Sequence, residues 1–125
     1  MRIFARVSVG AVGIICLVLG LAAFAAPERL GEALGVAAQT ELGLNSMRAD
    51  FGAFFLTAGT ACAAALLAGK TNWLWPAALL FLFAVIGRIL GVVMDGAPVG
   101  VATPIIVEIV FTAILINGAR TLPKS

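Results

Sequence analysis

Charged and titratable side chains are scarce in this sequence. It has no histidine and no tyrosine, and only 11% of its 125 residues are charged, whereas about 25% is usual for a soluble domain. The lack of histidine removes the commonest metal ligand and the commonest general base. Because 62% of the residues are hydrophobic, the composition predicts an integral membrane protein without a separate soluble domain.

Cysteine is equally sparse. Cys16 and Cys62 both fall in apolar stretches, and their spacing matches neither a metal motif nor a disulfide framework. We interpret them as small buried hydrophobic side chains. The sequence contains neither a phosphate-cradling loop nor a nucleophile with a base to activate it. It therefore predicts no metal and no cofactor, and it leaves open whether the protein is an enzyme.

Four long apolar runs are present, and each approaches the ~20 residues that cross a bilayer. The uncharged runs are Val7–Ala26, Phe51–Gly69 and Thr71–Gly87, and the fourth, Gly96–Ala119, is interrupted only by Glu108. The first is longer than the ~7–15 residues of a signal-peptide core, so we interpret it as a membrane helix. The predicted fold is all-α, a four-helix membrane bundle in one domain, 1–125, with helices at about 4–26, 49–69, 72–94 and 100–119.

The segment between the first two runs is the only substantial polar one. Pro27 suits the first position of a helix, and Glu28 follows in the first turn, where the helix dipole favours an acid. Leu30 and Leu34 then recur at helical spacing. This pattern predicts a short helix lying at the membrane interface. It is either an ordinary surface connection or a lid over the outer mouth of the bundle.

Charge is distributed unevenly between the two sides of this threading. The side without any acid carries Arg2, Arg6, Lys70, Arg120 and Lys124. Positively charged loops stay in the cytoplasm, so both termini and the turn at Lys70 are expected there. Because these cations are scattered along membrane edges and form no patch, a nucleic-acid partner is not expected.

The last two helices each contain one charge in an apolar run. Arg88 lies ten residues before Pro98 and Glu108 lies ten residues after it. If the chain folds back on itself at Pro98, both side chains reach the same depth, about 9–10 Å inside the helix ends at ~1.5 Å per residue. Charges inside a membrane usually face the bundle interior and pair. The sequence therefore predicts a membrane hairpin with an Arg88–Glu108 ion pair.

Three further charges map to the same half of the bundle as this pair. They are Arg48, Asp50 and Asp95, and Asp95 returns to the helix face of Arg88 after two turns. Two interpretations stay open. The pair either fastens the last two helices together, or it ends a polar pocket in which Arg88 binds an anionic or carbonyl group and Glu108 accepts or relays a proton.

A resemblance to a known family rests on several short motifs spread over nearly the whole chain. The motifs are Asn45-Ser46-Met47-Arg48-Ala49-Asp50-Phe51-Gly52, Gly87-Arg88, Asp95-Gly96-Ala97-Pro98 and Glu108. They resemble a bacterial family of small four-helix membrane proteins, a domain of unknown function within the DoxX-like superfamily. The resemblance implies a bundle in the bacterial inner membrane, and it marks Arg48, Arg88, Asp95 and Glu108. Some DoxX-like proteins are similar to subunits of quinone-linked sulfur oxidation, which suggests a role facing lipid or quinone.

Three functions compete at this point. The first is an accessory protein or subunit of a membrane complex, with a membrane-protein partner or a second copy of itself. The second is a binder or enzyme for a quinone or isoprenoid-type lipid that uses Arg88 and Glu108. The third is a proton-coupled small transporter, which is disfavoured because small multidrug exporters place an essential acid in the first helix and this chain has none there.

Overall fold

The computed structural model describes residues 1–125 and is helical throughout, without a strand. The helices are α1 (Arg2–Ala25), α2 (Pro27–Leu34), α3 (Glu41–Ala68), α4 (Leu74–Asp95) and α5 (Ala102–Thr121), and a single 3-10 turn, η1 (Thr71–Trp73), precedes α4. All except α2 are long and apolar enough to cross a membrane. The predicted all-α fold with four membrane-length helices is confirmed.

Two local expectations need correction. The second membrane helix begins at Glu41 and not near residue 49, because Thr40 caps it: the Thr40 hydroxyl accepts a hydrogen bond from the Gly43 amide at 2.9 Å. The last helix begins at Ala102 and not at residue 100, since Gly100 adopts a positive φ of 85° that ends the connecting loop. The short helix expected at Pro27 is present as α2, with Pro27 in its first turn.

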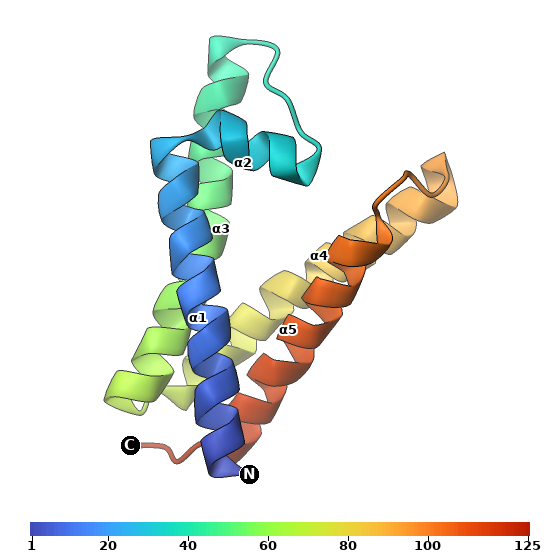
Figure 1. Ribbon diagram of the computed structural model, residues 1–125. Helices are drawn as coiled ribbons and strands as arrows, with labels where there is room; N and C mark the ends of the chain where they lie inside the picture. Colours follow the sequence, from blue (N-terminus) through green and yellow to red (C-terminus); the bar gives the residue numbers. More distant parts are fainter.

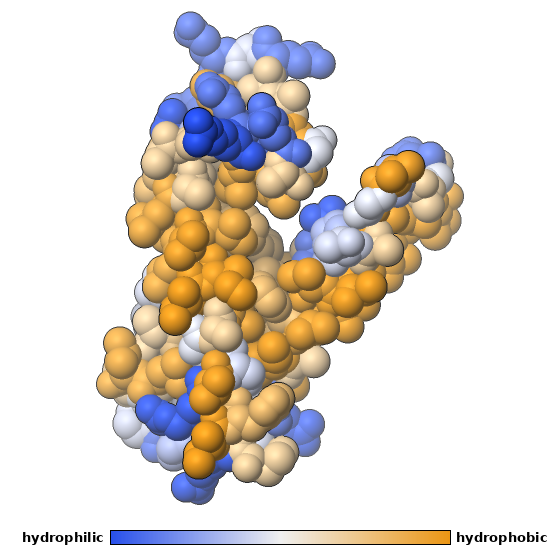
Figure 2. All heavy atoms as spheres, in the orientation of Figure 1, coloured by the Kyte–Doolittle hydropathy of each residue, from blue (hydrophilic) through white to orange (hydrophobic).

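The helices form two antiparallel pairs of unequal contact. α1 lies against α3 along most of its length, whereas α4 and α5 form a hairpin that leans away from this pair (Figure 1). Both termini lie at the end of the molecule where α3 turns into α4, and α2 lies at the opposite end. The arrangement resembles a V that opens toward α2, and we call the space between its arms the cleft (Figure 2).

Glycine allows the close packing of α1 against α3. A Cβ atom placed on Gly59 would lie 2.6 Å from Cγ of Leu17 and 3.0 Å from the Leu17 backbone nitrogen, and Gly20 meets Leu56 in the same way. Such contacts are typical of membrane helices, which gain stability from close backbone approach and not from exclusion of water. The α1–α3 pair is therefore the closely packed half of the molecule.

The hairpin touches this pair only at its lower half. The buried residues of α4 end at Val85, and those of α5 begin at Thr112. Near this level three aromatic rings from three helices meet edge to face: Phe54 of α3 lies 5.3 Å from Phe81 of α4, which lies 5.3 Å from Phe111 of α5. Edge-to-face contact is the favoured geometry for such rings. These phenylalanines form the floor of the cleft.

Replacing Gly59 by alanine should destabilise the protein by about 1–3 kcal/mol, the usual cost of overpacking. Gly87→Ala is the matched control, because a Cβ atom at Gly87 meets nothing within 4 Å. Thermal unfolding in detergent should show a lower midpoint for Gly59→Ala and an unchanged or slightly higher one for Gly87→Ala. Equal midpoints for the two variants would contradict the close α1–α3 contact.

Candidate functional site

The inward faces of α4 and α5 change from apolar to charged as they leave the core. On α4 the buried stripe of Phe81 and Val85 continues at helical spacing into Arg88, and on α5 the stripe of Leu115 and Thr112 continues into Glu108. Both charged side chains thus sit on faces that are buried lower in the bundle, at a level where the cleft has opened. Their position follows from the 3.6-residue period of each helix.

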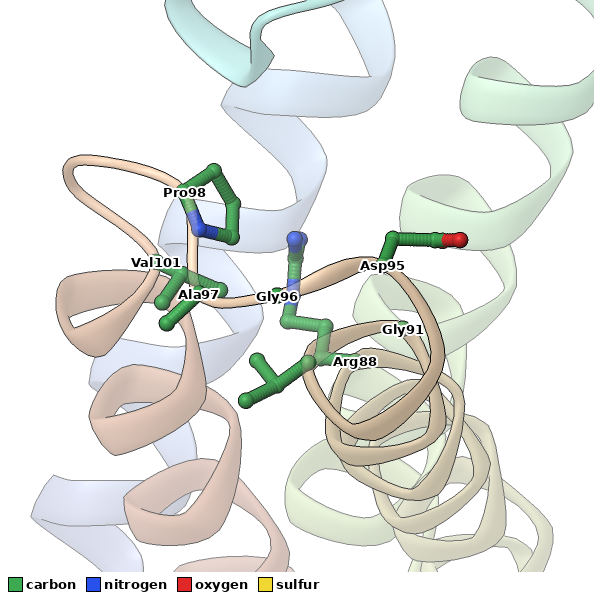
Figure 3. Close-up of a pocket in the computed structure, with 8 residues that line it drawn as sticks. Arg88, Gly91, Asp95, Gly96, Ala97, Pro98 and Val101 are labelled. Atoms are coloured by element: carbon green, nitrogen blue, oxygen red, sulfur yellow. The ribbon is translucent and has the colours of Figure 1, made fainter.

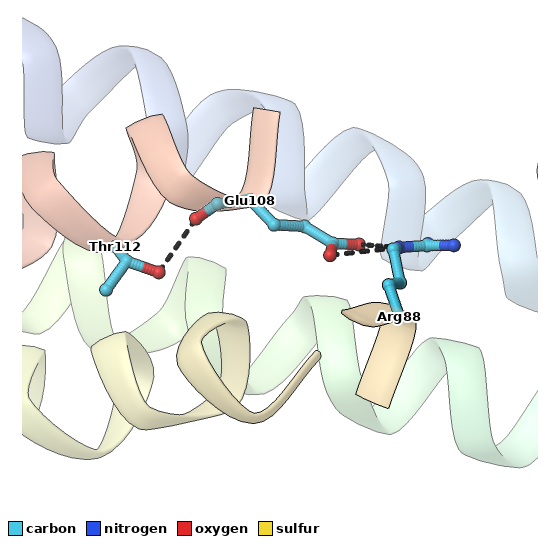
Figure 4. A network of polar contacts seen from close by, with 3 residues as sticks. All are labelled: Arg88, Glu108 and Thr112. Atoms are coloured by element: carbon cyan, nitrogen blue, oxygen red, sulfur yellow. Dashed lines mark hydrogen bonds and ion pairs between the residues drawn. The ribbon is translucent and has the colours of Figure 1, made fainter. Parts of the chain in front are cut away.

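Arg88 and Glu108 meet across the hairpin, as their equal distance from Pro98 predicts. Nε of Arg88 donates to both carboxylate oxygens of Glu108, at 2.8 Å to Oε1 and 2.9 Å to Oε2 (Figure 4). The Arg88 side chain is 33% exposed and that of Glu108 only 12%. One turn further along α5, the Thr112 hydroxyl donates to the backbone carbonyl of Glu108 at 2.7 Å. The Arg88–Glu108 contact is the only ion pair between side chains in the structure.

The pairing uses only part of the guanidinium. An arginine carries five N–H donors, and the single one on Nε serves the carboxylate. Both terminal amino groups of Arg88 are without a hydrogen-bond partner in the protein, and in Figure 4 they point away from Glu108. Arg88 is therefore fixed on one side and offers a planar fork of donors on the other.

A pocket of about 410 Å³ adjoins this free edge of Arg88. Its lining residues are Arg88, Gly91, Val92, Asp95, Gly96, Ala97, Pro98 and Val101. In Figure 3 the Arg88 side chain rises between the Ala97–Pro98 loop and the end of α4, while the Asp95 carboxylate points away from it. We call this the hairpin pocket. Gly91 contributes no side chain to the pocket wall, and a Cβ atom there would meet nothing within 4 Å.

The structure brings together three of the five sequence-predicted residues. Arg88, Glu108 and Asp95 share the arm, although Asp95 forms no ion pair. Arg48 instead donates from Nη1 to the Phe24 carbonyl near the end of α1, and Asp50 is exposed without an ion pair. A role for any of them in binding stays a prediction.

Sequence reasoning marked the Asp95–Pro98 loop as a motif but did not predict that it lines a pocket. Val92 and Val101 complete the pocket wall, and they gave no signal because they carry no polar side chain. A second pocket, of about 420 Å³, lies between α2 and the start of α3 and is lined in part by Glu28, Glu32 and Glu41. Glu28 and Glu32 lie one turn apart on α2, and the capped start of α3 brings Glu41 to the same pocket.

No group of three or more potential metal ligands occurs in the structure. Cys16 and Cys62 are free and buried, and both belong to the core shared by the helices. A Cβ atom at Gly13 would lie 2.8 Å from Cβ of Cys62, so this thiol occupies the tight α1–α3 contact. The two cysteines pack as small hydrophobic side chains.

Fold and site together define a small multi-pass membrane protein with four apolar helices and one charged pair in its hairpin arm. The chain belongs to the family described as Domain of unknown function (DUF4345), whose model matches residues 4–118. The match spans the loop of the hairpin pocket and all four long helices except a few terminal residues of α1 and α5. No curated protein and no solved structure matches the chain.

The ion pair can be tested by a double-mutant cycle. Arg88→Gln or Glu108→Gln alone leaves an unpaired charge in an apolar arm, which costs about 3–5 kcal/mol when the site is fully buried. Because Arg88 is 33% exposed, we expect about 1–3 kcal/mol for each single variant. The double variant should unfold in detergent at a higher temperature than either single one. A double variant that loses the sum of the single effects would show that the two charges do not stabilise each other.

Proposed function

We propose that this protein binds an amphiphilic molecule, of the quinone or isoprenoid-lipid class, in the cleft beside its hairpin arm. The observation that carries the proposal is the half-used guanidinium of Arg88. It is held by Glu108 through Nε, while its terminal amino groups face the hairpin pocket without a partner. Donors inside a membrane are costly to leave unsatisfied, so an acceptor on a ligand is the natural complement.

The surroundings of Arg88 suit a molecule with a polar head and an apolar body. The pocket walls include Val92 and Val101, and the phenylalanine floor lies deeper in the cleft. Binding sites for small molecules are typically apolar, with a few polar groups that set orientation. A head at Arg88 would therefore leave the apolar part of the molecule in contact with the cleft walls or the bilayer.

An accessory or subunit role is the second proposal, and the bareness of the arm supports it. Val93 and Met94 are 77% and 79% exposed, and Val99 at the tip of the loop is fully exposed. A helix of another membrane protein that packs against the arm would cover this apolar surface, and one that lies on the Arg88 face could offer a carbonyl or carboxylate to Arg88. The two proposals differ in the occupant of the cleft: a molecule of lipid size in the first and a helix of another protein in the second.

Location in the bacterial inner membrane and kinship with DoxX-like proteins are also proposals, supported by the motif resemblance. Both termini and the Lys70 turn are proposed to face the cytoplasm because that end carries five basic and no acidic residues. Green fluorescent protein fused after Ser125 should fluoresce in bacterial cells, and alkaline phosphatase inserted at Gln39 should be active. A non-fluorescent C-terminal fusion together with an inactive phosphatase at Gln39 would reverse the orientation.

Native mass spectrometry of protein released gently from its own membrane tests the occupant of the cleft. We expect an added mass of lipid size in the wild type that is lost in Arg88→Gln, because the head loses its donors. Arg29→Gln is the matched control: it removes the same charge from an exposed position on α2 outside the hairpin pocket. The control should keep the adduct.

The other outcomes decide between the proposals. An added mass of protein size that disappears in Arg88→Gln would replace ligand binding by the subunit role. A lipid-sized mass that persists equally in Arg88→Gln and Arg29→Gln would show that the bound molecule does not use Arg88. Bare protein in all three samples would overturn ligand binding at this site.

A further inference from the structure

The positive charge of Arg88 is already balanced where it stands. Both oxygens of the Glu108 carboxylate lie within 2.9 Å of Nε, so the pair carries no net charge. What remains on the pocket side is a set of N–H donors on a guanidinium whose charge is compensated. Such a group can donate strong hydrogen bonds without having to recruit a counter-ion from the ligand.

The remaining charge around the hairpin pocket is negative. Among its lining residues only Arg88 and Asp95 are ionisable, and with Glu108 behind Arg88 the group carries one more acidic than basic side chain. Asp95 forms no ion pair. An anionic head at Arg88 would therefore lie beside the Glu108 carboxylate, in a pocket whose other ionisable lining residue, Asp95, is also acidic.

The whole open end of the cleft has the same excess. The α2 end and the upper arm contain all six acidic residues of the chain but only three of its eight basic ones, Arg29, Arg48 and Arg88. The five other basic residues lie at the end that holds the termini, as the ribbon shows (Figure 1). A molecule that enters from the open end thus meets a field that disfavours anions.

The membrane strengthens the effect of this excess of acidic side chains. In a medium of low dielectric constant, charges interact over longer distances than in water, and an uncompensated charge is costly. An uncharged oxygen, such as a carbonyl or hydroxyl, accepts the free N–H groups of Arg88 without adding to the negative charge. An uncharged head with an oxygen acceptor therefore satisfies the free N–H groups of Arg88 and also avoids repulsion by the nearby acidic residues.

We infer that the hairpin pocket selects amphiphiles whose head is uncharged and bears carbonyl or hydroxyl oxygens, and that it discriminates against anionic lipids. Glu108 sets this selectivity as a positioning residue: it neutralises Arg88 and aims the free edge of the guanidinium into the pocket. The inference rests on the proposed function and adds the chemical class of the ligand.

Dioleoylglycerol and dioleoylphosphatidic acid test the inference, because they share both acyl chains and differ only in the phosphate. Purified protein in an uncharged detergent is titrated with each lipid, and the bound fraction is measured by native mass spectrometry. Binding in the pocket is the part lost in Gly91→Leu, which adds a bulky side chain to the pocket wall, and kept in Gly87→Leu, one turn away and outside the pocket lining. Comparing the two variants separates lipid bound in the pocket from phosphatidic acid bound to the basic residues at the other end of the molecule.

Wild-type protein should bind the diacylglycerol about tenfold more tightly than the phosphatidic acid in the pocket. Glu108→Gln should reverse the preference, because it exposes the uncompensated charge of Arg88. Asp95→Asn, at an exposed position where folding is not at risk, should shift the preference in the same direction by a smaller factor.

The failures of the two ideas are distinguishable. Pocket binding of phosphatidic acid as tight as that of diacylglycerol would overturn the selectivity and leave the proposed function standing. An unchanged preference in both Glu108→Gln and Asp95→Asn would likewise remove the electrostatic explanation. If neither lipid binds in a way that depends on Gly91, the inferred ligand selectivity fails, whereas the proposed function fails only if protein from its own membrane carries no mass that depends on Arg88.

Discussion

Compensation of charge within the apolar arm decides how the α4–α5 hairpin can fold. Neither Arg88 nor Glu108 could lie alone among apolar side chains and lipid at acceptable cost. They are compensated together only when the two helices are aligned about Pro98, because a slip of one residue rotates a side chain by 100° and moves it along the axis. The ion pair thus fixes the register of the hairpin, whatever else it does.

The rest of the architecture follows from a division between packed and unpacked halves. Small residues let α1 and α3 approach closely, with glycine facing leucine at two levels. The hairpin joins this pair through a limited core that ends near the three phenylalanines. Beyond Val85 on α4 and Thr112 on α5, toward the loop, no residue of the arm is buried, so the charged pair lies beside a cleft and not inside a sealed bundle.

Much of this could be predicted from the sequence, and the limits have physical causes. Four apolar runs, a proline at the start of α2 and two charges equidistant from Pro98 are local or symmetric signals, and each led to the right element or contact. The start of α3 was missed because a polar first turn resembles a loop until the Thr40 cap is seen. Arg48 was grouped with Arg88 by depth, but depth does not determine direction, and its guanidinium turns to the Phe24 carbonyl on α1. The angle at which the hairpin leans away from α1 and α3 depends on tertiary contacts, and these produce no periodic pattern in the sequence.

The limited base of the hairpin has a mechanical consequence. Asp95 lies fourteen residues beyond Phe81 on the same helix, or about 21 Å along its axis at ~1.5 Å per residue. A tilt of about 10° at the phenylalanine level would move the tip of the arm by roughly 4 Å. Arg88 and Glu108 would travel together through such a tilt, since both belong to the arm. The cleft can therefore widen or narrow around bound molecules of different thickness, while the Arg88–Glu108 pair keeps the same geometry toward the polar head of the molecule.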